Sequence, residues 1–473
     1  MSFVSIDFLV FLAVTLCGHR LLGSRPARIW LLTAASYVFY AWWDWRFCGL
    51  MLVVTTNAYV AGLFLGDPAS RHRKLVMAGT ICVDLAVLGF FKYFNFFLEN
   101  LRAASAYVGI GVSWPVMNVL LPIGISFYTF HAISYVFDVY RAKIRPERSF
   151  AKVALYIAFF PQLIAGPIVR ASFFLPQLSV DRRFRAVQWL TGAKLLLVGF
   201  IYKMIADQFA AIADPIFAHV AHHFNNNDNE ALVTAAVSFY AQIYFDFAGY
   251  SNMAIGTARL FGYRFPKNFD YPYSSLSVTE FWRRWHISLS SWLRDYLYVP
   301  LGGNRNGTAA RDRNLIITMV LGGLWHGASW NFVIWGALHG LGLLAHKAGL
   351  RLKPSTGPGG GSPLAGAAAL VLTQTWVFLA WIFFRANTLT DATQVLGAVF
   401  SPGISVLFSP EQPAVWILLV VATDHVLGRF RPKKALEPEA VRHPAYWVLA
   451  GLIAAIGLCL MPLSQKPFIY FQF

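Results

Sequence analysis

The stretch "LGGLWHGASWNFVIWGALHG", residues 321–340, places a histidine and small polar residues inside a long apolar run. The whole run, 315–346, is too long for one ordinary membrane-spanning helix, and its centre, "HGAS", is small and polar. We therefore expect two helices that meet near His326. Such breaks occur at membrane depth only where protein surrounds them or where they line a cavity, so His326 is expected at a cavity wall.

The composition of the chain places this run in a membrane protein. Of the 473 residues, 57% are hydrophobic, 16% are aromatic and only 13% are charged. A soluble globular domain does not have this composition. We expect an all-α, polytopic integral membrane protein of about 10–13 membrane segments, with re-entrant helices around a central cavity. No linker divides it, so one membrane domain is predicted over 1–473, with a motif-bearing core at about 116–346.

Apolar runs of roughly spanning length recur along the chain. They lie at 3–22, 28–45, 47–66, 75–98, 116–140, 187–218, 231–263, 364–386, 414–428 and 445–462. Two further stretches are interrupted, 150–168 by prolines and 279–300 by charges. The first run lacks a basic start and a small-residue cleavage site, so it is predicted to be a retained span.

The distribution of basic residues indicates the membrane topology. The formal charge is +17, but the basic residues lie in short loops and form no basic domain, which argues against nucleic-acid binding. By the positive-inside rule, loops rich in Lys and Arg are cytoplasmic, whereas 219–230 and 387–413, which contain neither, lie outside. The segments 150–168 and 315–346 then enter the membrane and return to the same side. The basic loops are 19–28, 71–74, 141–152, 170–185, 264–313, 347–353 and 429–442.

His326 has two interpretations. It could be a core histidine that bonds neighbouring carbonyls, or a functional imidazole, because polar residues at membrane depth are rare and an imidazole exchanges a proton near neutral pH. His339 is thirteen residues on, which on a continuous helix is another face, so a structural role is expected for it. The four cysteines show no metal-like spacing, and no metal site is predicted.

The segment "EFWRRWHISLSSWLRDYLYVPLGGNRNG", 280–307, is too charged to span lipid. Its Arg283, Arg284 and Arg305 could hold the phosphates of a ligand at the cytoplasmic face by bidentate hydrogen bonds. Asn304 and the neighbouring glycines suit a tight turn that a ligand can approach closely. Alternatively, the segment is an interfacial helix whose arginines reach membrane lipid headgroups.

A single acid, Asp246, lies inside the predicted span that contains "YAQIYFDFAGYSNMAIG", 240–256. A carboxylate in this position needs a partner. It pairs with a cation and holds helices together, or it orients the catalytic imidazole, and we favour a structural or orienting role.

Four motifs together resemble the membrane-bound O-acyltransferase family, in particular its bacterial polysaccharide-acetylating branch. They are "YFDFAGYSNMAIG", "NFDYPYSSLSVTEFWRRWHISLSSWLRDYLYVPLGGNRNG", "GGLWHGASWNFVIWGALHG" and the terminal "FIYFQF". The resemblance implies that His326 is the catalytic histidine and that His286 belongs to the second histidine motif. Asn252 departs from the family pattern, where aspartate is expected.

The resemblance implies that the chain is an O-acyltransferase of the bacterial inner membrane that passes an acetyl group from a cytoplasmic donor, acetyl-coenzyme A, toward an extracytoplasmic polysaccharide such as alginate. No cofactor is expected to stay bound. His326 would be the general base, with Trp325 or Asn331 stabilising the oxyanion. The chain has no G-x-S-x-G elbow, so a periplasmic partner resembling an SGNH hydrolase is expected to complete the transfer.

Three alternatives stay open at this point. The chain could move an activated acyl group or lipid without acyl chemistry, with His326 and Asp246 in a proton relay. It could be a scaffold for polysaccharide export. It could also belong to a branch directed at peptidoglycan or at D-alanyl transfer, because alginate, cellulose, peptidoglycan and teichoic acid branches share these motifs.

Overall fold

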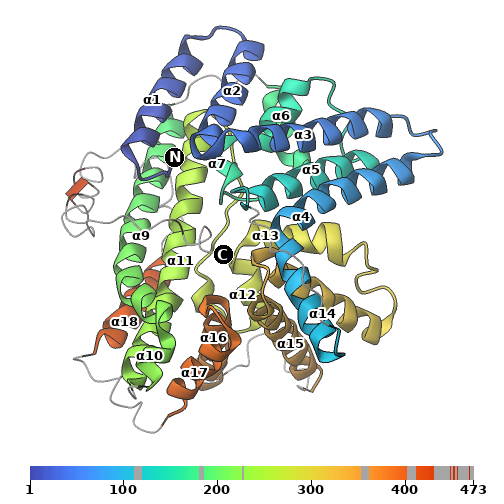
Figure 1. Cartoon of the computed structure of the whole chain (residues 1–473). Coiled ribbons are helices and arrows are strands. Elements are labelled where there is room, and N and C mark those ends of the chain that lie inside the picture. The colour runs from blue at the N-terminus through green and yellow to red at the C-terminus, as the bar shows by residue number, and fades with distance from the viewer. Residues whose placement is uncertain are drawn as a thin grey trace. The chain divides into compact units, whose positions relative to one another are not determined.

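The structure is a computed structural model, and its described part is helical (Figure 1). It describes residues 1–110, 120–180, 186–225, 228–352, 362–401 and 412–430, with residues 448, 451, 452, 455 and 468. Its contacts form two compact units. The first comprises 1–196 and 253–266, and the second comprises 197–252 and 267–473. The all-α class expected from the composition is confirmed.

The first unit is a set of apolar helices. They are α1 (Ile6–Leu21), α2 (Arg25–Asp44), α3 (Arg46–Leu65), α4 (Arg73–Tyr107), α5 (Ile125–Tyr140), α6 (Phe150–Ala158), α7 (Phe160–Leu163), α8 (Ala171–Leu178) and the start of α9 (Ala186–Ala218). Serine caps fix the first two helices, because the hydroxyls of Ser5 and Ser24 accept hydrogen bonds from backbone N–H groups three residues on.

Two predicted boundaries in this unit need comment. The predicted helix over 116–140 is wrong at its start, because α5 begins only at Ile125, after Pro122 and after Gly124 with φ +76°. Residues 111–119 lie outside the described part. The predicted break within 150–168 is confirmed, because α6 ends at Ala158 and α7 starts at Phe160.

The second unit carries the motif segments. Its helices are the rest of α9, α10 (Val220–Asn225), α11 (Asn229–Leu260) as far as Asn252, η1 (Pro272–Ser274), α12 (Val278–Arg284), α13 (Ile287–Leu293), the π-helical turn η2 (Arg294–Tyr298), α14 (Gly307–His326), α15 (Trp330–Leu352), α16 (Pro363–Arg385), α17 (Leu389–Val399) and α18 (Pro413–Phe430). The remainder of α11, from Met253, belongs to the first unit. The charged stretch 279–300 is thus a series of short helices. The predicted span 445–462 lies largely outside the described residues.

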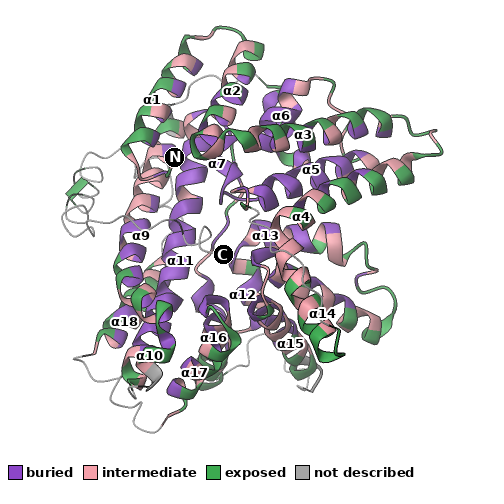
Figure 2. Ribbon diagram, in the orientation of Figure 1, coloured by how far each residue is buried: buried purple, intermediate pink, exposed green. Residues whose placement is uncertain are grey.

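Five of the described helices are long and apolar enough to cross a membrane. They are Arg46–Leu65, Arg73–Tyr107, Gln188–Ala218, Asn229–Leu260 and Pro363–Arg385. Of these, α11 is the most enclosed, with 94% of its apolar window buried inside the protein (Figure 2). A helix that faces protein can carry a carboxylate such as Asp246 at far lower cost than one that faces lipid.

The break in 315–346 is confirmed and has a packing cause. α14 ends at His326, α15 begins at Trp330, and the two helices run side by side (Figure 1). A Cβ on Gly323 would lie 2.1 Å from the carbonyl oxygen of Phe332, and one on Gly336 would lie 2.4 Å from that of Met319. Glycines therefore allow the two backbones to approach within contact distance.

Replacing Gly336 with alanine should separate α14 from α15. Overpacking against a backbone carbonyl costs about 1–3 kcal/mol, so we expect a lower melting temperature of the detergent-solubilised protein. Gly349→Ala, on the same helix with nothing within 4 Å of the added Cβ, is the matched control and should leave the melting temperature unchanged or raised. Equal melting temperatures for the two variants would contradict the close-packing explanation.

Candidate active site

His326 ends α14 inside an aromatic enclosure of the second unit. Only 4% of its surface is exposed. The rings of Trp325, Trp335 and Phe384 surround it, with centroids 4.9, 5.1 and 5.1 Å from that of the imidazole, all three edge-on. Trp335 comes from α15 and Phe384 from α16. The imidazole therefore lies where three helices meet, in surroundings that exclude most water.

His286 lies in the same cluster. It is fully buried between α12 and α13, and its ring centroid is 6.1 Å from that of Trp325. Trp325 thus contacts both motif histidines, which are forty residues apart in sequence. His286 has φ +40°, a left-handed conformation that side-chain-bearing residues rarely adopt and that clusters at functional sites.

Asn268 fixes the tautomer of His286. The Oδ1 atom of Asn268 accepts the backbone N–H of Ser288 at 3.2 Å, and its Nδ2 donates to Ser251 at 3.0 Å. Since Oδ1 can only accept, the Nδ1 atom of His286, 3.1 Å away, carries a proton and donates it. Nε2 is left unprotonated and has no hydrogen-bond partner among the described residues. That nitrogen can therefore accept a hydrogen bond.

Burial keeps His286 neutral. The residue lies outside the five candidate spans, and desolvation lowers its pKa to about 3. Asn268 and Ser251 were missed by the sequence analysis. Both lie within the quoted motifs, each beside an aromatic residue, Phe269 and Tyr250, and no other local signal singled them out.

His339 also joins the aromatic cluster. Trp335 contacts it at 4.7 Å, and Nε1 of Trp282 donates to its Nδ1 at 3.3 Å. The argument that His339 faces away from His326 assumed a continuous helix and is wrong, because the turn after His326 folds α15 back along α14. Its contacts with Trp282 and Trp335 are consistent with the expected structural role.

Asp246 pairs with a cation of the neighbouring helix. Its Oδ1 is 3.0 Å from Nζ of Lys203 on α9, and the same ammonium lies 2.6 Å from Asp207. The carboxylate therefore links α11 to α9. Of the two roles considered for Asp246, this geometry favours helix packing. Asn252, the departure from the family pattern, is half-buried next to Ser251.

Of the two suggested oxyanion donors, Asn331 has its donor group engaged. Its Nδ2 donates to the carbonyl of Ala386 at 2.8 Å. It therefore ties the start of α15 to the end of α16 and positions the turn beside His326. Trp325 remains next to both histidines.

Among the described residues, no three His, Cys, Asp or Glu side chains gather as a metal site requires.

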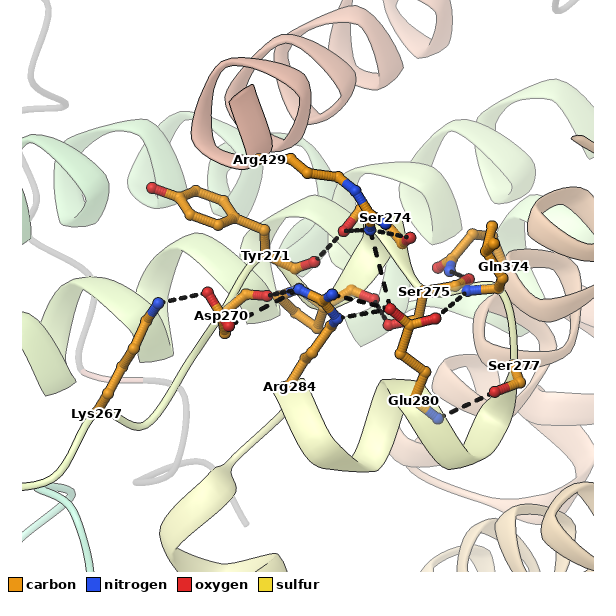
Figure 3. A network of polar contacts seen from close by, with 12 residues as sticks. Lys267, Asp270, Tyr271, Ser274, Ser275, Ser277, Glu280, Arg284, Gln374 and Arg429 are labelled. Atoms are coloured by element: carbon orange, nitrogen blue, oxygen red, sulfur yellow. Dashed lines mark hydrogen bonds and ion pairs between the residues drawn. The ribbon is translucent and has the colours of Figure 1, made fainter. Parts of the chain in front are cut away.

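The four residues expected at the donor phosphates differ in their surroundings. Arg284 is engaged in an ionic network, with Nε 2.9 Å from Glu280 and Nη1 3.1 Å from the carbonyl of Asp270 (Figure 3). Oδ1 of Asn304 accepts the hydroxyl of Tyr298 at 2.6 Å. Arg283 and Arg305 are exposed. Arg283 and Arg305 are therefore accessible to a ligand, whereas Arg284 is bonded to Glu280 and Asp270.

The same network connects distant segments of the second unit. Arg429 of α18 donates to the carbonyl of Ser274 at 3.2 Å and lies 3.9 Å from Glu280 (Figure 3). Glu280 also accepts the backbone N–H of Leu276 at 2.9 Å.

The glycine turn predicted next to Asn304 is confirmed, because Gly302 and Gly303 have φ +110° and +54°.

A cavity of about 440 Å³ adjoins the turn that follows His326. Its wall consists of the turn 327–329, Phe332, the corner 384–387 between α16 and α17, and Ala218 at the end of α9. One wall residue, Phe384, also contacts the ring of His326. Arg385 in this wall is 8% exposed and pairs with Asp214 at 3.2 Å.

Comparison with known proteins identifies the family of the chain. The model of the membrane-bound O-acyltransferase family matches residues 126–356. The chain is 39% identical over its whole length to the probable alginate O-acetylase AlgI of Azotobacter vinelandii, all of which it covers. The chain belongs to the membrane-bound O-acyltransferase family. It is therefore a multi-pass membrane protein and an O-acyltransferase.

Two other relatives are similar to this chain over most of its length. The chain is 43% identical to the probable alginate O-acetylase AlgI of Pseudomonas aeruginosa, with 85% of this chain and 76% of that protein covered. It is 34% identical to the peptidoglycan O-acetyltransferase of Helicobacter pylori, with 84% and 79% covered. His286 and His326 lie inside the matched family region.

Asn268→Ala should lower the rate of acyl transfer strongly while it lowers the melting temperature only slightly. The variant loses the acceptor that fixes the His286 tautomer, and a buried hydrogen-bond defect costs about 1–3 kcal/mol, or roughly 10- to 100-fold in rate if it acts in the transition state. Asn268→Asp keeps an acceptor for Nδ1 and should retain more activity at a similar melting temperature. Equal rates for the two variants would contradict a tautomer-fixing role.

Proposed function

We propose that the acyltransferase passes an acetyl group from cytoplasmic acetyl-coenzyme A through the bacterial inner membrane for O-acetylation of an extracytoplasmic polysaccharide. The single observation that carries this proposal is the buried pair of motif histidines, His326 and His286, which both contact the ring of Trp325. The names of two relatives, alginate O-acetylase and peptidoglycan O-acetyltransferase, support polysaccharide acetylation as the outcome.

His326 is the general base of the proposed reaction. Its imidazole takes the proton of the acceptor hydroxyl as the oxygen attacks the acetyl carbonyl. The tetrahedral oxyanion then collapses, the carbon–sulfur bond breaks, and the thiolate takes the proton back from the imidazolium. The aromatic enclosure supports this role, because proton transfer is efficient where water is excluded and the base is held in place.

His286, which also contacts Trp325, supports the same step. With Nδ1 donating to Asn268, its Nε2 is left unprotonated and the ring stays neutral. A neutral imidazole beside the base can accept a hydrogen bond without adding a second positive charge to a poorly solvated site. We assign His286 to substrate or proton positioning and His326 to the base.

The donor side of the site is proposed at the cytoplasmic face. Arg283 and Arg305 are exposed and lie in the most basic loop, 264–313, so their guanidinium groups are available to the phosphates of the donor or to lipid headgroups. A separate periplasmic acetyltransferase resembling an SGNH hydrolase completes the transfer to the polymer in this proposal. Its basis is that the chain has no serine elbow of its own.

His326→Ala and His326→Gln should abolish polysaccharide acetylation while membrane expression stays near normal. Loss of a general base costs on the order of 10² to 10⁴ in rate. The acetyl content of the isolated polymer, measured by NMR, tests this. His339→Ala is the comparison variant and should have a milder effect, because His339 only bonds Trp282 within the cluster. Wild-type acetylation in the His326 variants would exclude the catalytic assignment.

Arg283→Lys and Arg305→Lys should raise the Michaelis constant for acetyl-coenzyme A in proteoliposomes. A lysine keeps the charge but loses the bidentate fork, and a charge-assisted hydrogen bond contributes about 1.5–3 kcal/mol, roughly 10- to 100-fold. Arg284→Lys should instead lower the melting temperature, because it breaks bonds to Glu280 and Asp270. An unchanged Michaelis constant in the first two variants would assign those arginines to lipid headgroups.

A further inference from the structure

The indole N–H of Trp335 is buried beside His326 without a hydrogen-bond acceptor among the residues that the structure describes. Trp335 is 1% exposed, and its ring lies edge-on to the imidazole of His326, with centroids 5.1 Å apart. An indole nitrogen can only donate, and an unbonded donor that is shielded from water is costly, so each one in a native structure needs an explanation. This donor is available to a ligand that binds at His326.

His339 presents a second unbonded donor on the same helix. Nε1 of Trp282 donates to Nδ1 of His339 at 3.3 Å, and because an indole cannot accept, this Nδ1 carries no proton. The proton of the ring is then on Nε2, which is fully buried and has no partner in the described part of the chain. Trp335 and His339 are four residues apart on α15, and their ring centroids are 4.7 Å apart. The two donors therefore lie on the same side of α15.

The chemistry of these donors indicates the atom that they would bind. Both are neutral N–H groups, and the rings of Phe281, Trp381 and Phe384 pack against them. A permanent anion is costly to bury among such rings. A carbonyl oxygen is neutral when it binds and gains negative charge only as a tetrahedral intermediate forms, and buried N–H donors stabilise that charge best where water is excluded. An acetyl carbonyl fits these donors.

We propose that Trp335, through its Nε1–H, is the oxyanion donor of the acyl transfer, with the Nε2–H of His339 as a second donor. The assignment rests on the proposed acetyl transfer and adds the groups that stabilise its intermediate. As the acceptor oxygen bonds to the acetyl carbon and His326 takes its proton, the carbonyl double bond becomes a single bond to O⁻, which the two N–H groups bind. The double bond then re-forms, the carbon–sulfur bond breaks, and the thiolate takes the proton from His326.

The carbonyl stretching frequency of the bound donor tests this contact without turnover. The full chain carrying His326→Ala is purified in detergent and mixed with acetyl-coenzyme A that is isotopically labelled at the acetyl carbonyl carbon. A hydrogen bond to the oxygen weakens the double bond and lowers its frequency. In isotope-edited infrared difference spectra, adding Trp335→Phe should therefore move the labelled band to higher frequency, and adding His339→Phe should move it less.

Matched substitutions separate this contact from packing. Trp376→Phe, on α16, removes an indole that donates to the carbonyl of Leu338 at 3.2 Å, so it should lower the melting temperature and leave the band in place. Because truncation of a buried indole also removes packing, Trp335 is in parallel replaced by benzothienylalanine, which keeps the shape but has no N–H, and the band should move equally. A band that moves with Trp325→Phe but not with Trp335→Phe would overturn the assignment, as would a band that moves with neither.

A split between kcat and KM shows the consequence for the reaction. In inverted membrane vesicles of the producing cells, which retain the natural acceptor, Trp335→Phe should lower kcat roughly 100-fold, as loss of one oxyanion donor does, and change the KM for acetyl-coenzyme A little. His339→Phe should lower kcat less, because Trp335 still donates. If the wild-type chain binds no acetyl-coenzyme A, the proposed donor fails and this assignment fails with it. If wild type transfers acetyl and both changes at Trp335 keep its kcat, the assignment fails and the function stands.

Discussion

The close approach of α14 to α15 is the contact on which the rest of the site depends. Gly323 and Gly336 face backbone carbonyls of the opposite helix at distances that leave no room for a side chain. This approach lets the chain reverse within the three residues 327–329. His326 therefore ends one helix while Trp335 of the next lies against it. A larger residue at either glycine would push the two backbones apart and shift Trp335 relative to His326.

Aromatic side chains then determine the environment of both histidines. Trp325, Trp335 and Phe384 enclose His326, and Trp325 and Phe247 enclose His286. Rings supply a large apolar surface with few polar atoms, so they exclude water without competing for the protons of the imidazoles. Acyl transfer requires this exclusion, because water is a nucleophile present at far higher concentration than any acceptor. The polar contacts of the site, such as the bond from His286 to Asn268, orient the rings within this enclosure.

The charged segment of the second unit has two distinct kinds of arginine. Arg284 and Arg429 converge on Glu280 and donate to the carbonyls of Asp270 and Ser274, respectively (Figure 3). They thereby link α12 to α18. Arg283 and Arg305 remain exposed. Residues adjacent in sequence have different roles here because successive side chains of a helix point about 100° apart. The sequence spacing of a basic cluster therefore does not determine how many of its members can reach a ligand.

The sequence alone determined the helical membrane class, the position of the break at His326 and the family, because hydrophobic run length, a small polar interruption and contiguous motifs are local properties of the chain. Only the tertiary structure decided which polar side chains meet. His286, His326 and Asn268 are brought together by three separate segments, and Asp246 pairs with Lys203 across two helices. His339 was misplaced for the same reason. A helical repeat gives the direction of a side chain only while the helix continues, and the reversal at 327–329 depends on contacts between backbones that no local pattern specifies.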